Sequence, residues 1–454
     1  MRNKNGYKIM EKEELKKQMM ELWKENFHDS DEYIKLVFDR YFDPEYVEYE
    51  EREGRIIASL LAVPYTFGND DYSIKGVYLC GLSTYLKHRG EGIMTDLLRR
   101  IEVRMAEKGY AFMFLIPANE GLNRYYNDRG FINGFYKSRL HYTSIHDFKK
   151  DYFSTLMKEE RALSEVKRGY YNCLDVEIID RQEALFEGDV LTEIINFILA
   201  CECRQQGLSI YQNYDQLKTA LEEALISGGE LAICRNREDE VAGIGLYSRS
   251  ENEIKEYGRY AINYGALCKL REVVTLTSDD RNLTVIQYGY ENTSNNKSLW
   301  NPMFSTILPG TTQVGAVGMI ERVYDPNSHS EIYGMVRILS ISEILKFLSN
   351  WRRDLKYSIL VRWEKSGKIS EFVAKDGQVE EKEVTLDNSD HDSEDTSYKN
   401  KKIVHIRDNH GYERIVLSER DLGEILFRRP GGDRLIEEAF GLPALNGRIS
   451  LLLD

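Results

Sequence analysis

A short segment in the first quarter of the chain, Lys87–Gly92 (Lys-His-Arg-Gly-Glu-Gly), places two glycines two positions apart. It follows the apolar run Val77–Leu82 and precedes an amphipathic stretch that begins at Ile93. This order predicts a strand, a glycine-containing loop and a helix. Glycines lack the Cβ atoms that would keep a phosphate from the main chain, and the first N–H groups of a helix attract anions. We therefore expect residues 87–94, the cradle loop, to bind a pyrophosphate group.

The cradle loop differs from the two commonest phosphate-binding loops. It does not end in Gly-Lys-Ser/Thr, and Thr95 stands where Gly-x-Gly-x-x-Gly requires a third glycine. It resembles instead the coenzyme A signature of the GNAT acetyltransferases, Gln/Arg-x-x-Gly-x-Gly/Ala. Lys87 departs from this pattern at the first position, although Arg89 still supplies a guanidinium.

The next forty residues extend the resemblance. A helix is expected from Ile93 to Gly109, followed by the apolar run Ala111–Ile116, which is typical of a parallel strand buried on both faces. Asn119 can cap a short helix that contains Tyr125 and Tyr126. This helix runs into Gly130-Phe131, which resembles the second GNAT signature, an aromatic pair before x-x-x-Gly-Phe.

The resemblance implies an acetyl-CoA site. Main-chain groups of Leu82, Ser83 and Thr84 would pair with the pantetheine arm, and Arg89 to Met94 would supply the pyrophosphate amides. The residues assigned to the coenzyme are Leu82, Ser83, Thr84, Arg89, Gly90, Glu91, Gly92, Ile93, Met94 and Asn119. Some of these side chains also have structural explanations: Leu82 in the core, Ser83 and Thr84 against a neighbouring strand, and Glu91 in solvent.

Tyr126 is the first candidate for catalysis. A phenol, with an ordinary pKa near 10, can return a proton to the departing coenzyme A thiolate as a general acid. Packing alone would also explain a tyrosine in this helix, since the chain has 30 tyrosines. Its position four residues before Gly130 distinguishes Tyr126 from the others.

Composition limits the other partners. The 454 residues carry a net charge of −14, which argues against nucleic acid because phosphate neutralisation needs clustered Lys and Arg. No apolar run approaches the roughly 20 residues that span a bilayer, and the N-terminus lacks a secretory apolar core. We expect a cytoplasmic protein without membrane insertion. The six cysteines form neither a disulfide framework nor a zinc site, so no metal is expected.

Three domains are expected: a GNAT domain over 1–148, a second GNAT-like domain over 149–332, and a sterol carrier protein-like domain over 333–454. The middle region repeats the opening plan of two helices and a hairpin but has no cradle loop, so it is expected to be catalytically silent. Asn133-Gly134 is a turn signal. Leu386–Ser397 is acidic and is expected to be a disordered hairpin tip. This organisation resembles the Eis-like (enhanced intracellular survival) acetyltransferases, which implies a mixed α/β, α+β fold.

The same resemblance suggests a general base. In Eis-like proteins the C-terminal carboxylate reaches the acetyltransferase cleft, and the corresponding group here is Asp454, preceded by the apolar tail Ile449–Leu453. A terminal strand that completes the last sheet would explain this tail equally well. Asp29 and Asp31 could attract an amine, although a helix cap also explains Asp31.

Two functions follow. The first is an acetyl-CoA-dependent N-acetyltransferase that acts on a small-molecule or peptidyl amine by direct attack on the thioester. The alternative is a lipid- or acyl-ligand-binding protein with a vestigial acetyltransferase domain. The cradle loop and Tyr126 favour the first. The sequence leaves open which amine is used and whether the chain forms a homo-oligomer.

Overall fold

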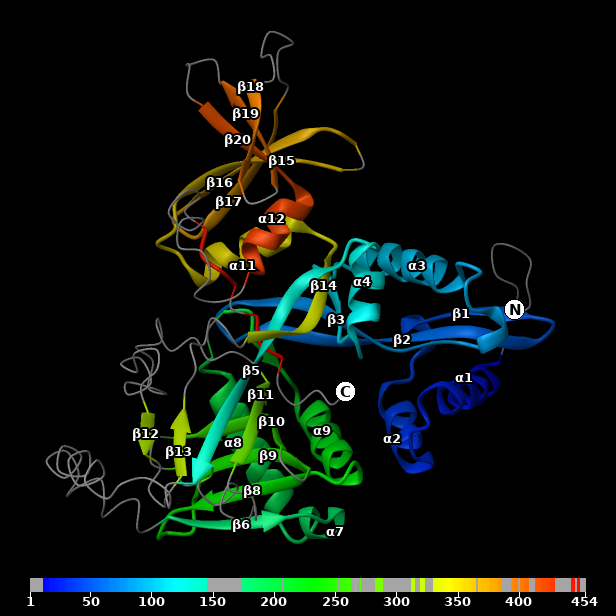
Figure 1. Ribbon diagram of the computed structural model, residues 1–454, viewed down its shortest axis with the longest axis vertical. Coiled ribbons are helices and arrows are strands. Elements are labelled where there is room, and N and C mark those ends of the chain that lie inside the picture. Colours follow the sequence, from blue (N-terminus) through cyan, green and yellow to red (C-terminus); the bar gives the residue numbers. More distant parts are fainter. Residues whose placement is uncertain are drawn as a thin grey trace, which may run out of the picture.

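The computed structural model describes residues 11–144, 174–205, 207–250, 253–262, 266, 270, 282–288, 312–314, 319–322, 330–364, 366–384, 393–398, 401–407, 413–428, 442–445 and 447–449. These residues form one sheet of 14 strands and another of six, with helices packed on both (Figure 1). The mixed α+β class expected from the sequence is confirmed.

The first domain begins with two helices whose apolar faces cover the sheet. Leu15, Met19, Leu22 and Trp23 are buried on the first helix, and Ser30 caps the second by accepting a hydrogen bond from the Tyr33 amide. Ser30, rather than Asp31, is therefore the cap. The elements are α1 (Lys12–Phe27), α2 (Asp31–Tyr41), η1 (Pro44–Tyr46), β1 (Val47–Arg52), β2 (Arg55–Gly68), β3 (Ser73–Thr84), η2 (Leu86–His88), α3 (Ile93–Glu107), β4 (Phe112–Leu115), α4 (Glu120–Asn127) and β5 (Ile132–Ser144).

The middle region repeats this plan. Its elements are β6 (Asp175–Ile179), α7 (Gln182–Leu185), α8 (Val190–Glu202), β7 (Ile210–Tyr211), α9 (Tyr214–Ile226), β8 (Glu230–Arg235), β9 (Val241–Ser250), β10 (Glu253–Ala261), β11 (Asn282–Tyr288), β12 (Thr312–Val314) and β13 (Met319–Arg322). Two long helices again precede an antiparallel meander, and β10 runs parallel to β11 as β3 runs parallel to β4. The middle region therefore shares two long helices, an antiparallel meander and a parallel strand pair with the first domain.

Strand β14 (Ser330–Ile338) completes the first domain from a distance of about two hundred residues. The order of the large sheet is β1-β2-β3-β4-β14-β5-β11-β10-β9-β8-β6, so β14 lies between β4 and β5. It is antiparallel to both, with Ile338 opposite Phe112 and Val336 opposite Ile132. The expected domain boundary at 332/333 falls inside this strand.

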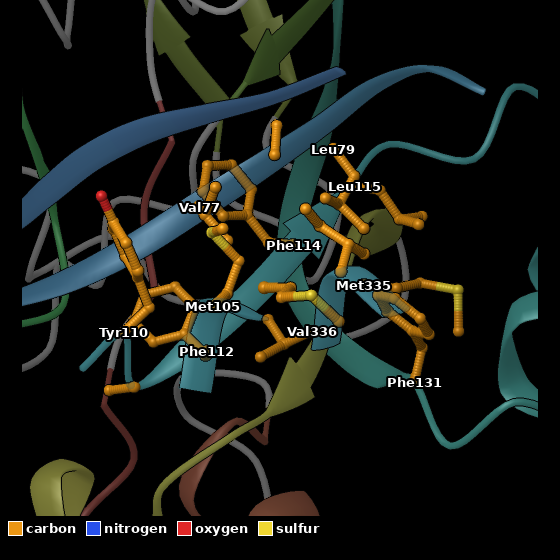
Figure 2. Close-up of a cluster of buried hydrophobic side chains, with 14 of the residues drawn as sticks. Val77, Leu79, Met105, Tyr110, Phe112, Phe114, Leu115, Phe131, Met335 and Val336 are labelled. Carbon is orange, nitrogen blue, oxygen red and sulfur yellow. The ribbon is translucent and has the colours of Figure 1, made fainter. Parts of the chain in front are cut away.

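The core of the first domain lies around β4. All four β4 residues are buried, because strands flank β4 on both sides and side chains of neighbouring elements cover both faces. Figure 2 shows Phe112 and Phe114 with Met105 of α3 and with Met335 and Val336 of β14. Aromatic rings of β2 and β5 extend this cluster, since Phe67 lies 5.0 Å from Phe112 and Phe135 lies 5.6 Å from Phe114 between ring centroids. The strand from beyond the middle region is therefore part of the first domain's core.

The last region forms the six-stranded sheet, in the order β17-β16-β15-β20-β19-β18. Figure 1 shows α11 and α12 between this sheet and the large one. Ser340 and Ser418 cap these helices through their hydroxyls. The elements are α11 (Ile341–Trp351), β15 (Tyr357–Arg362), β16 (Ile369–Lys375), β17 (Gln378–Val384), β18 (Ser393–Tyr398), β19 (Lys401–Arg407), β20 (Glu413–Ser418) and α12 (Glu419–Leu426).

Two local expectations are wrong. Part of the acidic segment expected to be disordered is strand β18, because pairing with β19 satisfies its backbone whatever its side chains are. Asn133-Gly134 is not a turn but lies within β5. Gly134 serves close packing there, since a Cβ atom at this position would overlap the Val336 side chain.

Candidate active site

A wedge opens between β3 and β4. The two strands pair only from Gly76 to Tyr78, opposite Phe112 to Phe114. Beyond this point a bulge in β3, between Cys80 and Ser83, places two residues opposite Leu60 of β2 and bends the strand. Gly81 in the bulge has φ +59°, and a Cβ atom there would overlap the Trp23 ring. The β3 edge from Leu79 to Thr84 is therefore no longer paired with β4.

The cradle loop lies at the end of this edge. Gly90 and Gly92 have φ of +85° and +81°, and no atom lies within 4 Å of a Cβ atom built on either. Gly92 is the N-cap of α3. Among the described residues, the amides from Gly90 to Met94 have no hydrogen-bond acceptor. The loop is thus a set of free donors at the positive end of a 15-residue helix, as the sequence predicted.

The charged side chains of the loop are held by neighbouring elements. Glu91 accepts from Nδ1 of His88 (2.9 Å) and pairs with Arg52 (2.8 Å). The hydrogen bond from His88, with that from Arg52, lowers the pKa of Glu91. Arg89 donates to the Thr84 carbonyl (3.2 Å) and to Oδ1 of Asn26 (2.7 Å), which ties the loop to β3 and α1. These contacts occupy the side chains of Glu91 and Arg89 and leave the main-chain amides from Gly90 to Met94 free in the described part of the chain.

The other expected coenzyme residues lie close by. Leu82 and Thr84 are half-buried on the part of β3 that no longer pairs with β4. The Ser83 side chain is buried and faces Ser59 of β2, with 3.5 Å between the hydroxyls. Asn119 caps α4 by accepting from the Leu122 amide (3.0 Å). The side chains of Ser83 and Asn119 therefore have structural partners.

Tyr126 lies on the buried side of α4, with 7% of its surface exposed. Its ring packs against Tyr125 (5.3 Å) and Phe131 (5.6 Å between centroids). Among the described residues no hydrogen bond joins its hydroxyl to a protein group. Burial raises the pKa of Tyr126, so the phenol stays protonated at neutral pH. The side chain can therefore act as a proton donor, because no described protein group accepts a hydrogen bond from its hydroxyl.

Arg129 connects α4 to the first turn of α3. Its Nε donates to Oγ1 of Thr95 in the first turn of α3 (2.9 Å), and its guanidinium stacks on the Tyr125 ring, 3.4 Å from the centroid. It also donates to the Tyr125 carbonyl (2.7 Å). The sequence analysis missed this residue, although an arginine directly before Gly130-Phe131 was a signal that could have found it.

Two of the three residues expected to act on the acceptor amine, Asp29 and Asp31, lie among the described residues. Asp29 accepts a hydrogen bond from the Trp23 indole (2.7 Å), and exposed Asp31 pairs with Lys24, so each has a partner within the protein. Asp454 and most of the apolar tail lie outside the described residues. The segment before it is anchored, because Arg448 exchanges backbone hydrogen bonds with Leu208 and Ile210 (2.9 and 2.8 Å) and Ile449 is fully buried.

Comparison with known proteins agrees with this geometry. Residues 7–132, which include the wedge, the cradle loop and Tyr126, match the acetyltransferase (GNAT) domain model. This part of the chain is a GNAT acetyltransferase domain. No curated protein matches it in sequence.

Solved structures extend the similarity beyond this GNAT domain. A GCN5-related N-acetyltransferase from Kribbella flavida has 13% identity and a TM-score of 0.56, over 96% of this chain and 95% of that one. Eis1 from Mycobacterium abscessus has 10% identity and a TM-score of 0.54, over 95% and 92%. A probable N-acyltransferase from Enterococcus faecalis has 12% identity and a TM-score of 0.55, over 83% and 85%. The chain therefore has an Eis-like multi-domain fold.

Two further findings concern membranes and metals. None of the helices in the described part of the chain is both long and apolar enough to cross a membrane. The described residues also bring together no group of three His, Cys, Asp or Glu side chains suited to a metal ion.

Proposed function

We propose that this GNAT acetyltransferase transfers an acetyl group from acetyl-CoA to a primary amine by direct attack on the thioester. The pyrophosphate would lie on the cradle loop, and the pantetheine arm would follow the unpaired edge of β3. The observation that carries the proposal is Tyr126, a largely buried side chain on α4, which Arg129 ties to the first turn of α3 through Thr95 and the Tyr125 carbonyl. An intact donor loop with such a proton donor favours a transferase over a lipid-binding protein.

The amine lone pair forms the new C–N bond at the thioester carbonyl, and the C–S bond then breaks. Tyr126 protonates the leaving thiolate, and the proton lost by the amine restores the phenol through solvent or a base. A phenol with a raised pKa is a weaker acid, but burial also raises the pKa of thiols, as it does for Cys80 on β3. A desolvated thiolate is therefore basic enough to take this proton.

The base in this proposal is the C-terminal carboxylate of Asp454. The support for this proposal is that the segment before the last five residues is anchored. These five residues therefore start beside the sheet of the GNAT domain. A carboxylate with an ordinary pKa of about 3.5–4 is a poor base for an ammonium. Its larger contribution would be to attract and position the protonated acceptor.

Replacing Tyr126 with phenylalanine tests the proposal. Coenzyme release with acetyl-CoA and a panel of polyamines, aminoglycosides and lysine peptides measures turnover. We expect Tyr126→Phe to lower kcat by roughly 10²-fold or more while the Kd for coenzyme A is unchanged. Tyr125→Phe is the matched control, because it keeps the ring under Arg129 and should keep wild-type turnover. Equal kcat in both variants, with chemistry limiting the rate, would make Tyr126 a packing residue.

A further inference from the structure

A cavity of about 500 Å³, the interdomain cavity, lies between the GNAT domain and the last domain. Its walls come from the last two turns of α3, the Gly130 turn, Arg337–Leu339 at the end of β14, the loop after β15 and the start of α12. In Figure 1 both α3 and α12 lie on the side of the large sheet that faces the six-stranded sheet. Small-molecule sites in proteins have volumes of this order. The space can therefore hold a small organic molecule, and it belongs to neither domain alone.

The interdomain cavity and the wedge lie at opposite ends of β4. Ile338 and Leu339 in the cavity wall lie beside the start of β4, where the Leu339 amide donates to the Ala111 carbonyl (2.8 Å). The wedge opens after Phe114, near the end of the strand. On α3 the cavity begins at Glu102, so about 15 Å of helix separates it from the cradle loop. A molecule in the cavity would therefore lie apart from the proposed transfer site.

The two cationic side chains in the cavity wall already have partners. Arg337 pairs with Glu102 (3.2 Å) and donates to the Gly130 carbonyl. Arg420 of α12 pairs with Glu424 (3.2 Å). Its Nη atoms also donate to the main-chain carbonyl and to Oδ1 of Asn127 on α4 (3.4 and 3.1 Å). The arginines therefore hold the protein together and do not neutralise the other carboxylates of the wall.

Three carboxylates of the wall, Glu107, Glu364 and Glu419, form an ion pair with no cation among the described residues. Glu419 accepts a hydrogen bond from the Glu364 amide (2.9 Å), which holds the loop after β15 against the start of α12. Glu107 is the last residue of α3, at the negative end of the helix dipole. The wall of the cavity thus has an excess of negative charge that favours a positively charged guest.

An apolar wall with a fixed aromatic ring accompanies these carboxylates. The indole N–H of half-buried Trp363 donates to Oγ of Ser370 (2.8 Å), and the ring packs edge-on against Phe372 (6.1 Å between centroids). Val103 of α3 is 49% exposed and lines the cavity together with Leu339. Indole rings attract cations through their faces, and covering an exposed aliphatic side chain is favourable. The lining therefore suits a cation that also carries an apolar group.

We propose that the interdomain cavity binds an amphipathic organic cation. Its ammonium group would lie beside Glu107, Glu364 and Glu419, and its apolar group would cover Trp363 and Val103. A metal ion would leave the apolar wall uncovered, and a neutral ligand would leave the carboxylates without a counter-charge. The proposal does not depend on acetyl transfer, because the cavity and the wedge lie at opposite ends of β4.

Calorimetry on the full chain tests the ligand class with benzyltrimethylammonium. Its quaternary nitrogen cannot be acetylated, so binding is measured apart from turnover. We expect one site per chain, with a Kd roughly tenfold or more below that of tetramethylammonium, which lacks the apolar group. Benzyl alcohol, which lacks the charge, should also bind more weakly. The Kd of benzyltrimethylammonium should be the same with and without coenzyme A, because the two sites are separate.

A pair of double variants tests the position of the charge. Glu107→Gln with Glu364→Gln changes two exposed side chains of the wall, so the fold should be kept and the Kd for benzyltrimethylammonium should rise roughly fivefold or more. Glu380→Gln with Glu381→Gln is the matched control. It removes the same charge from exposed positions of β17 that do not line the cavity, and it should leave the Kd unchanged.

Hydrogen exchange tests where the cation binds. Benzyltrimethylammonium should slow amide exchange at Gly130, in the cavity wall, and should leave the cradle loop unchanged. Slower exchange in the cradle loop alone, or loss of binding in the presence of coenzyme A, would place the cation in the wedge and overturn the proposal. Equal effects of the two double variants would reduce the attraction to net charge and also overturn it, as would the absence of binding to the wild type.

Discussion

Arg337, near the end of β14, donates a hydrogen bond to the carbonyl oxygen of Gly130 (3.2 Å), in the turn that follows Tyr126. The same guanidinium pairs with Glu102 of α3 (3.2 Å). Gly130 has φ +82°, and a Cβ atom there would overlap Arg337, so the glycine also makes room for this contact. A side chain that follows the middle domain thus holds the turn between the proposed catalytic helix and β5.

Removing this guanidinium should loosen the turn. We expect Arg337→Met to lower the free energy of unfolding by about 1–3 kcal/mol, because it removes the ion pair with Glu102 and the hydrogen bond to the Gly130 carbonyl. Denaturant unfolding measures the change. Arg99→Met is the control, since Arg99 pairs with Asp96 at 3.4 Å where both side chains are about 70% exposed, and such pairs contribute little. Equal stabilities in the two variants would mean that β14 packing alone holds the turn.

Replacing Gly92 of the cradle loop with aspartate should abolish coenzyme binding. Gly92→Asp adds a side chain and a negative charge where the pyrophosphate is proposed to bind, so coenzyme A should no longer bind measurably in calorimetry. Gly109→Asp is matched to it, because Gly109 has φ +79° and open space around it but lies at the other end of α3. The control should bind one coenzyme A per chain. Two sites per chain would contradict the silent middle domain.

Glu223, a buried residue of α9, should make stability fall with rising pH. Burial, with the charge of Glu222, raises the pKa of Glu223 to about 8, whereas the unfolded chain releases this proton near 4.5. The native state therefore holds more protons between these values, and the free energy of unfolding decreases as pH rises through them. The contribution of Glu223 is complete below 4.5 and lost above 8.

The best window for measuring this effect is pH 7 to 8. Glu202, whose pKa burial raises to about 7, adds the same sign at lower pH. From pH 7 to 8 we expect Glu223→Gln to remove a slope of up to about 1.4 kcal/mol per pH unit. Urea unfolding at several pH values gives this slope. Parallel pH profiles for wild type and variant would show that Glu223 is ionised already at pH 7.

The C-terminal carboxylate should act on turnover and not on coenzyme affinity. Deleting Leu453 and Asp454 removes the proposed acceptor-positioning charge, so acetylation should fall sharply while coenzyme A binds as before. Appending a short neutral tail should cause similar harm because it moves the charge. Asp454→Asn keeps the α-carboxylate and separates its effect from that of the side chain. Wild-type rates in the deletion and extension variants would exclude the terminus from the reaction.

The donor side of the site could be predicted from sequence because it is local. The end of β3, the cradle loop and the start of α3 occupy consecutive residues up to Met94, and periodicity and glycine spacing predict this order, although not the bulge in β3. The helix with Tyr126 follows in the same stretch, with Asn119 as its cap. Such features depend on backbone preferences and near neighbours, which a sequence displays directly.

The tertiary structure decided the rest. Strand β14 pairs between β4 and β5 although two hundred residues separate them, and no local pattern marks Arg337 as the partner of Gly130. Glu223 is one of 75 acidic residues, and only the packing of α9 against α2 shows that it is buried and unpaired. Asn133-Gly134 carried a turn signal that the β5 pairing overrode. Contacts between distant segments depend on which surfaces bury each other, and this is decided only when the whole sheet packs.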